Sequence, residues 1–424
     1  MSIKLRLKLL FILQYAVWGA YLTSMGTYLA RNGMANQIGL FYSVQGFVSL
    51  CMPAIMGIIA DRWVQAQKLL CICHILAGVF KASMCFYGIS AGSSVAFAPF
   101  FMLYACCILF YMPTIALSNS VAYSTLENHD LEPIKEFPRI RIWGTVGFIV
   151  SMWIVDLGGM QTTAMQFGWS ALLSFILALY ALGIPACKIN KKEGKKTLLE
   201  AMGLDAFALF RNYRMAVFFI FSILTGVCLQ ITNGFANPFI SSFGQLPEFS
   251  DTFGVKHANI LISISQISET LCFLLIPFCL QKFGIKRVML IALFSWALRF
   301  LLFALGDPGE GIWMFILSMI VYGFAFDFFN ISGSLFVNKE TDARMRSSAQ
   351  GLFMMMTNGF GTTLGMLSAQ QVINHYINGL GDSVTGHEII EGWQTCWYIF
   401  AAYALCVAIA FAFLFQYKHT PVQK

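Results

Sequence analysis

The sequence contains little charge and few polar stretches. Only 11% of its 424 residues are charged, whereas about a quarter of the residues in a soluble domain are. It has no Gly-rich phosphate-binding loop, which argues against ATP as an energy source. It also has no recognisable catalytic constellation, and its longest polar stretch is too short to fold a signalling domain. These absences exclude a soluble enzyme and argue against a multispan membrane enzyme or sensor.

Cysteine is present but absent from the loops where disulfides form. Most of the 12 cysteines lie within apolar runs. Cys71, Cys73 and His74 have the composition of a metal site, but positions two and three apart on a helix do not converge as tetrahedral ligands do. We therefore expect the cysteines to be packing residues, with no metal and no cofactor.

Apolar residues occur in long runs. The chain is 58% hydrophobic with 41 Phe, and many runs approach the ~20 residues with which a helix spans a bilayer. A β-barrel would show short alternating segments instead. We predict an all-α membrane protein with twelve transmembrane helices, at 9–30, 37–60, 69–91, 95–123, 140–158, 166–187, 215–243, 257–280, 286–305, 311–336, 347–375 and 394–416.

The twelve spans divide six and six around the one long polar stretch. We expect an N-terminal half at 1–187, a cytoplasmic loop at 188–214 with an amphipathic surface segment, and a C-terminal half at 215–424. The halves echo each other weakly, since Tyr111 and Asn119 recur as Tyr322 and Asn330 at the same spacing. Paired halves with a substrate site at their interface are a recurring transporter architecture.

The net charge of +7 comes from loops on one side of the predicted spans. This positive-inside asymmetry places both termini in the cytoplasm, and the basic excess does not indicate nucleic-acid binding. The opposite side offers only Arg31 and Lys256 beside several carboxylates. The cationic set is Lys4, Arg6, Lys8, Arg62, Lys68, Lys135, Arg139, Lys188, Lys191, Lys192, Lys195, Lys196, Arg211, Arg214, Lys282, Lys286, Arg287, Lys339, Arg344, Arg346, Lys418 and Lys424.

Several charged residues lie inside predicted spans, and three of them, Arg141, Glu269 and Asp327, lie in blocks considered further below. A charge at the bilayer centre costs about 2.5–3.5 kcal/mol on the insertion scale. Three charges therefore oppose insertion by roughly 8–10 kcal/mol, unless they face one another or a water-filled cavity. The pattern indicates a transporter with a polar, proton-titratable site near the membrane midplane.

Further polar and aromatic residues share helix faces with these charges. Gln and Asn in membrane helices often only bond a neighbouring helix, and a single Phe or Tyr is usually a packing residue, so these alternatives stay open. Arg141 also lies near a predicted cytoplasmic end, where an arginine can snorkel. The set suits a ligand with a flat ring and several hydroxyls: Arg141, Thr145 and Phe148; Gln230 and Asn233; Gln266 and Glu269; Tyr322, Phe326 and Asp327.

Two resemblances sharpen this interpretation. Gly57-x-x-x-Asp61-Arg62 resembles the loop motif of the major facilitator superfamily, although the residues after Arg62 depart from it. The blocks QYAVWGAYL, FPRIRIWGTVGF, GLDAFALF, FFIFSILTGVCLQITN, SISQISETL, LSMIVYGFAFDFFNISGSLFV and SAQGLFMMMTNGFG resemble the bacterial nucleoside:proton symporter family across nearly the whole chain.

The family resemblance implies a monomeric, multi-pass carrier of the bacterial cytoplasmic membrane that imports nucleosides with protons by alternating access. It implies that Arg141, Thr145, Phe148, Gln230, Asn233, Gln266, Glu269, Tyr322 and Phe326 bind the nucleoside. A nucleoside is neutral, so accumulation needs a group that changes charge. Asp327 and Glu269 are the candidate proton carriers, with Arg141 as counter-charge. The alternative is a carrier of the same superfamily for another small neutral solute such as a sugar.

Other polar residues in the spans lie outside those expectations. His74 and Lys81 are not in a block that carries the resemblance, so we expect neither to be functional. We expect Arg299 to form a structural pair or to snorkel. Asn119 and Asn330 are expected to bond neighbouring helices.

Overall fold

The structure is a computed structural model that describes residues 2–92, 94–187, 204–342, 345–380 and 384–417. These residues form helices joined by short turns, without a β-strand among them. Most of the expected central loop and the last residues of the chain lie outside this part. The end of that loop, Leu204–Arg211, is described and forms the short 3-10 helix η2.

The helices follow the predicted spans closely. In the first part of the chain they are α1 (Ile3–Gly19), α2 (Met25–Arg31), η1 (Ala35–Gln37), α3 (Ile38–Arg62), α4 (Ala66–Ala91), α5 (Phe97–Glu127), α6 (Pro133–Leu157) and α7 (Met165–Leu182). After η2 come α9 (Tyr213–Ser242), η3 (Phe243–Gln245), α10 (Phe253–Lys256), α11 (Ala258–Leu305), α12 (Ile312–Glu340), α13 (Arg346–Met354), η4 (Met355–Gly361), α14 (Thr362–Ile373), η5 (Asn374–Asn378) and α15 (Gly386–Leu414).

Nine helices in the described residues are long and apolar enough to cross a membrane. One of them, α11, is 48 residues long and bends at Gly284, whose φ of 76° only glycine adopts easily. It therefore supplies two crossings. The pair α1–α2 and the run α13–η4–α14–η5 supply two more, each interrupted by a turn or by π-helical backbone. Together these make the predicted twelve.

Local signals explain where several helices begin. The side chain of Asn212 caps α9 by accepting from the backbone N–H groups of Arg214 and Met215. Thr385 and Glu388 form a capping box at the start of α15. Pro133 occupies the first turn of α6, where its missing N–H is not needed. Both α6 and α15 begin seven or eight residues before the predicted spans, at 133 and 386 rather than 140 and 394.

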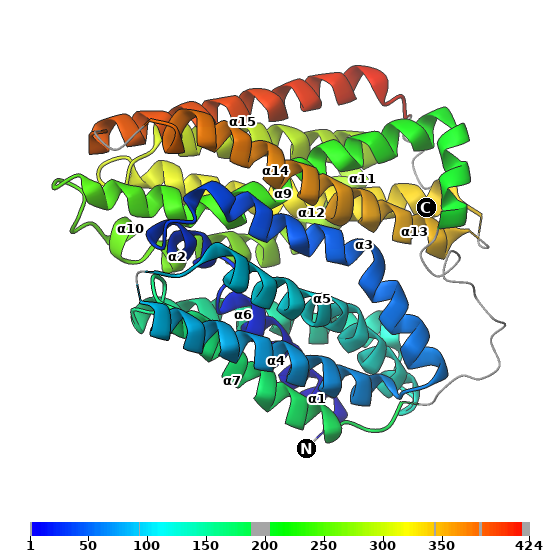
Figure 1. The fold of residues 1–424 in the computed structure, drawn as a ribbon. Coiled ribbons are helices and arrows are strands. Elements are labelled where there is room, and N and C mark those ends of the chain that lie inside the picture. Colours follow the sequence, from blue (N-terminus) through cyan, green and yellow to red (C-terminus); the bar gives the residue numbers. More distant parts are fainter. Residues whose placement is uncertain (1, 93, 188–203, 343–344, 381–383, 418–424) are drawn as a thin grey trace. The chain divides into compact units, whose positions relative to one another are not determined.

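Contacts divide the chain into two compact units, Met1–Ala35 with Phe47–Met202, and Asn36–Gly46 with Gly203–Lys424. In the first unit, α4 and α7 run side by side (Figure 1). Helix α1 packs so closely on α6 that a Cβ on Gly147 would overlap the carbonyl group of Ile12. Small residues permit such close approach of membrane helices.

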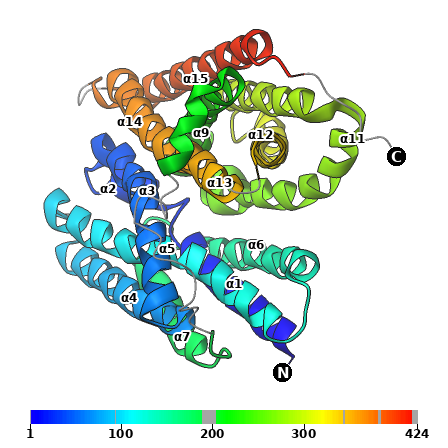
Figure 2. The same cartoon turned by 90° about the vertical axis from the view of Figure 1, so that its right-hand side faces the viewer.

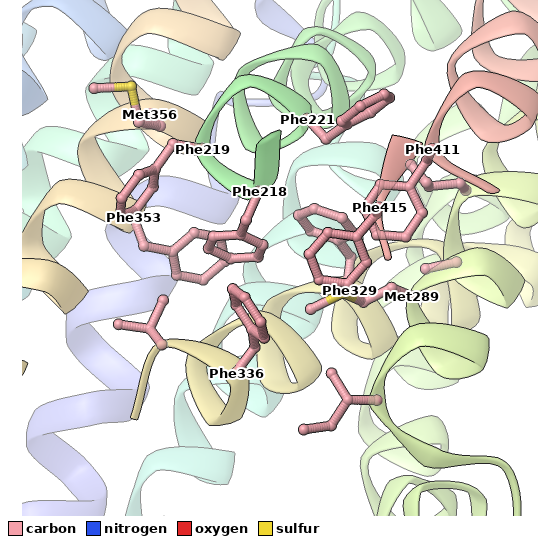
Figure 3. Close-up of a cluster of buried hydrophobic side chains, with 14 of the residues drawn as sticks. Phe218, Phe219, Phe221, Met289, Phe329, Phe336, Phe353, Met356, Phe411 and Phe415 are labelled. Carbon is pink, nitrogen blue, oxygen red and sulfur yellow. The ribbon is translucent and has the colours of Figure 1, made fainter. Parts of the chain in front are cut away.

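The second unit is built around α12. Figure 2 looks along this helix and shows the two limbs of α11 beside it. Its core is an aromatic cluster from α9, α12, α13 and α15 (Figure 3). The fully buried ring of Phe218 lies 4.9 Å from Phe336 and 5.1 Å from Phe353, centroid to centroid. Because lipid is as apolar as these rings, close packing rather than escape from water holds the cluster together.

Candidate functional site

Two of the three predicted residues of α6, Arg141 and Phe148, contact α1. Arg141 and Thr145 are partly buried and Phe148 is buried. The guanidinium carbon of Arg141 lies 3.9 Å from the ring centroid of Tyr15, a cation–π contact. The ring of Phe148 lies edge-on to Trp18, with centroids 6.3 Å apart. Both partners come from α1, so the close α1–α6 packing fixes where Arg141 and Phe148 lie.

Tyr15 and Trp18 were not predicted as site residues. Both lie in QYAVWGAYL, one of the blocks that carries the resemblance, and their spacing of three places them on one helix face. That spacing was the available signal. Which aromatic residues contact α6 depends on the register of α1, and the sequence does not give that register.

A buried polar network adjoins the rings of Tyr111 and Trp18, which together we call the aromatic wall. Gln14 donates from Nε2 to Thr114 Oγ1 at 2.7 Å, and its Oε1 lies 2.9 Å from His74 Nε2. The hydroxyl of Tyr111 donates to the main-chain oxygen of Gln14 at 2.9 Å. The ring of Tyr111 lies 6.3 Å from that of Trp18. His74, expected to be non-functional, lies edge-on to Tyr111 with ring centroids 6.0 Å apart.

In the second unit, the predicted amides and carboxylates lie on α9 and α11. Asn233 donates from Nδ2 to Gln230 Oε1 at 2.6 Å, so these two residues form a pair on one face of α9. Gln266 on α11 is buried, and its Oε1 has no hydrogen-bond partner in the described part of the chain. Glu269, one turn further along α11, is half-buried. A buried amide oxygen without a partner is unfavourable, which makes Gln266 a natural acceptor for a ligand hydroxyl or N–H.

Helix α12 brings the predicted aromatic and acidic residues together. The rings of Tyr322 and Phe326 stack in parallel, with centroids 5.7 Å apart and planes within 3°. Asp327 is buried, and both it and Glu269 interact electrostatically with the Tyr322 hydroxyl. Two carboxylates and one phenol therefore occupy one neighbourhood, while Phe326 is partly exposed beside it.

Phe326 lines a small, partly open pocket. The pocket is both aromatic and polar, which suits a planar ring that carries hydrogen-bonding groups. Asn330 contributes to it and donates from Nδ2 to the main-chain oxygen of Phe326 at 3.0 Å. The lining residues are Thr225, Gly226, Leu229, Trp296, Ala325, Phe326, Phe329, Asn330 and Thr357.

Arg299 packs against Tyr322, the phenol of this neighbourhood. Its side chain is 2% exposed and does not snorkel. It donates from Nη1 to the main-chain oxygen of Ser318 at 2.7 Å, and its guanidinium carbon lies 4.6 Å from the centroid of Tyr322. The expected structural pairing is thus with a carbonyl group and a ring.

The whole chain matches one protein-family model. The model of the nucleoside H+ symporter family covers residues 1–420. The chain belongs to this family. Among curated relatives of the symporter, nucleoside permease NupG of Escherichia coli K12 is 46% identical over 100% of this chain and 98% of that protein. Xanthosine permease of the same organism is 44% identical over 99% and 98%.

Solved structures agree with this assignment. A crystal structure of a mutant form of the nucleoside transporter NupG superposes with a TM-score of 0.91 at 44% identity, covering 98% of the symporter and all of that chain. A peptide transporter, at 11% identity and a TM-score of 0.71 over 97% and 94%, shares the fold alone. The predicted family and the twelve-helix fold are confirmed, and the symporter is a multi-pass membrane protein.

Proposed function

We propose that the chain is a proton-coupled symporter that imports nucleosides across the cytoplasmic membrane by alternating access. The observation that carries this proposal is the neighbourhood on α12, where Phe326 lines the pocket and stacks on Tyr322, which interacts with Glu269 and Asp327. Membership of the nucleoside H+ symporter family supports it. The two relatives described above are named as a nucleoside permease and a xanthosine permease, and xanthosine is itself a nucleoside.

The predicted binding residues take roles that follow from their chemistry. Phe326 and Phe148 stack on the base, a contact worth roughly 1–3 kcal/mol per base. Gln266, with its unpartnered Oε1, accepts from the ligand. The remaining polar groups bind ribose hydroxyls or base edges: Arg141, Thr145, Gln230, Asn233, Glu269 and Tyr322.

The proton is carried by a carboxylate of the second unit. Asp327 is buried within α12, and Glu269 is half-buried on α11. Burial favours the protonated form of a carboxyl group, so either residue can take up a proton inside the membrane and release it when the site is wetted. Of the two, the more deeply buried Asp327 is our first candidate.

The orientation follows from the distribution of cationic loops. We propose that both termini face the cytoplasm and that the halves at 1–187 and 215–424 alternate around the substrate. Cysteine-substituted loop positions, labelled with an impermeant thiol reagent in intact cells, test this orientation. Labelling of a terminal residue from outside would contradict it.

Uptake into membrane vesicles tests the function against the sugar alternative. Vesicles that contain the transporter should accumulate labelled uridine, adenosine or xanthosine, and vesicles from cells without it should not. Unlabelled nucleosides should compete with the label, and sugars at the same concentration should not. Competition by a sugar without competition by any nucleoside would favour the alternative.

A further inference from the structure

Lys81 is a buried cation that the proposed transport cycle does not use. Its side chain is 1% exposed, in the interior of the first unit. Within the described residues, Nζ makes one hydrogen bond, to Ser174 Oγ on α7 at 3.3 Å. Among the residues that the structure describes, no carboxylate lies within ion-pair distance of it. An ammonium group has three N–H donors and is strongly hydrated in water, so this environment leaves the charge poorly compensated.

Cation–π contacts with two aromatic rings are the main compensation for the charge on Lys81. Nζ lies 4.4 Å from the ring centroid of Tyr111 on α5 and 5.5 Å from that of Tyr21 on α1. The titratable groups that interact with it are His74 on its own helix, Cys107 and Tyr111 on α5, and Tyr21 on α1; α7 contributes the hydroxyl of Ser174. None of these groups is an anion near neutral pH.

Two rings, those of Tyr111 and Trp18, connect Lys81 to Phe148 of the proposed site. Tyr111, whose face it covers, lies 6.3 Å from Trp18. Trp18 in turn lies edge-on to Phe148 at 6.3 Å. A charge on Nζ attracts the face of Tyr111. It thereby fixes Tyr111 and, through it, Trp18, the ring against which Phe148 packs.

The second unit repeats this arrangement with a different cation. Arg299 lies 4.6 Å from the centroid of Tyr322, and Tyr322 stacks on Phe326. Tyr111 and Tyr322 are the two tyrosines that recur at equal spacing from Asn119 and Asn330. In each unit, then, a fully buried cation covers a tyrosine that supports an aromatic residue of the proposed site.

The two cations differ in one chemical respect. A guanidinium keeps its proton in proteins, whereas an amine loses it readily when buried. We propose that Lys81 is a switchable positioning residue. With its proton it holds the Tyr111–Trp18 wall beside Phe148 and gives high nucleoside affinity; without the proton the wall loosens and affinity falls. This inference rests on the proposed function, in which Phe148 contacts the substrate.

The direction of the pH dependence follows from the charge. The contact between Nζ and the Tyr111 ring is fully present at low pH, where Lys81 is protonated, and is lost as pH rises through its titration. The dissociation constant for a nucleoside should therefore rise at alkaline pH, where binding weakens. We call this part of the pH profile the alkaline limb. The carboxylates Glu269 and Asp327 also titrate, so the limb must be assigned by comparing variants.

Calorimetric titration of uridine into the purified transporter between pH 6 and pH 9 tests the inference. Lys81→Met removes the charge and should weaken binding about tenfold at low pH. As pH rises along the alkaline limb, the affinity of the wild type should fall towards that of Lys81→Met. Lys81→Arg fixes the charge and should keep tight binding without that limb. Lys68→Met, which removes an exposed lysine from the same helix, is the matched control and should match the wild type.

Arg299→Lys is a second variant for the case in which a Lys81 variant does not fold. It replaces the guanidinium beside Tyr322 with an amine that can lose its proton, so the loss of affinity on the alkaline limb should become larger. A limb that persists unchanged in Lys81→Arg, or a Lys81→Met protein with wild-type affinity across the pH range, would overturn the inference. Absence of nucleoside binding by the wild-type protein is a separate result, which would reject the proposed function itself.

Discussion

Phe326 offers the most direct test of a single binding residue. Its ring stacks on Tyr322 and lines the pocket on α12. Phe326→Ala should weaken nucleoside binding by ~1–3 kcal/mol, roughly 5- to 150-fold, because the base loses its stacking partner. Phe324→Ala is the matched control, since Phe324 lies on the same helix but packs against the aromatic cluster. Calorimetry on purified protein should show a larger loss for Phe326→Ala than for the control.

Asp327, the next residue, has a different environment and a different predicted role. Its side chain is buried and interacts with Tyr322 and with Cys272 of α11. Asp327→Asn keeps the shape of the side chain but removes its titratable charge. It should abolish concentrative uptake into vesicles while nucleoside binding remains measurable. Glu269→Gln is the comparison. If the Asp327→Asn protein still concentrates nucleoside with normal pH dependence, Asp327 is not the proton carrier and Glu269 becomes the candidate.

The residues of the proposed site are easier to predict from the sequence than the residues that pack behind them. Tyr322, Phe326 and Asp327 follow one another on α12 at spacings that already placed them on neighbouring faces. Lys81 gave no such signal, because a lysine within an apolar run looks the same whether it faces lipid, water or a ring. Its meaning depends on which residues of α1, α5 and α7 surround it, and only tertiary packing decides that.

Helix boundaries show a similar limit. The bend of α11 at Gly284 falls within the predicted break at 281–285, because glycine and nearby charges mark the turn in the sequence. The early start of α15 is different. Its first turns contain His387, Glu388 and Glu391, which lower hydropathy, and the Thr385–Glu388 capping box was the signal that a purely hydrophobic criterion overlooks.

The contact between α1 and α6 determines how Arg141 and Phe148 are presented. A Cβ on Gly147 would overlap the carbonyl group of Ile12 and lie 2.7 Å from its Cα. Gly147→Ala should therefore separate the two helices and lower stability by about 1–3 kcal/mol. Thermal unfolding in detergent should show a reduced midpoint together with weaker nucleoside binding.

Gly57→Ala is the control for this helix-packing prediction. Gly57 lies within α3, and a Cβ built there meets no atom within 4 Å in the structure. Alanine also favours a helix over glycine by about 1 kcal/mol, so this variant should keep or raise the midpoint. Equal effects of the two substitutions would mean that loss of a glycine, rather than the α1–α6 contact, causes the change.

At the scale of the whole molecule, the proposed cycle must couple the transport of a neutral nucleoside to the entry of a proton. Each proton that enters through ~100 mV releases ~2.3 kcal/mol, which supports roughly 50-fold accumulation of nucleoside. Adding a nucleoside to lightly buffered, de-energised cells should therefore make the medium transiently alkaline. Cells that produce Asp327→Asn should not show this change, because the buried carboxyl group that is our first candidate carrier is missing. A protonophore should reduce uptake to equilibration, and concentrative uptake that persists undiminished after the gradient collapses would show that another energy source drives this transporter.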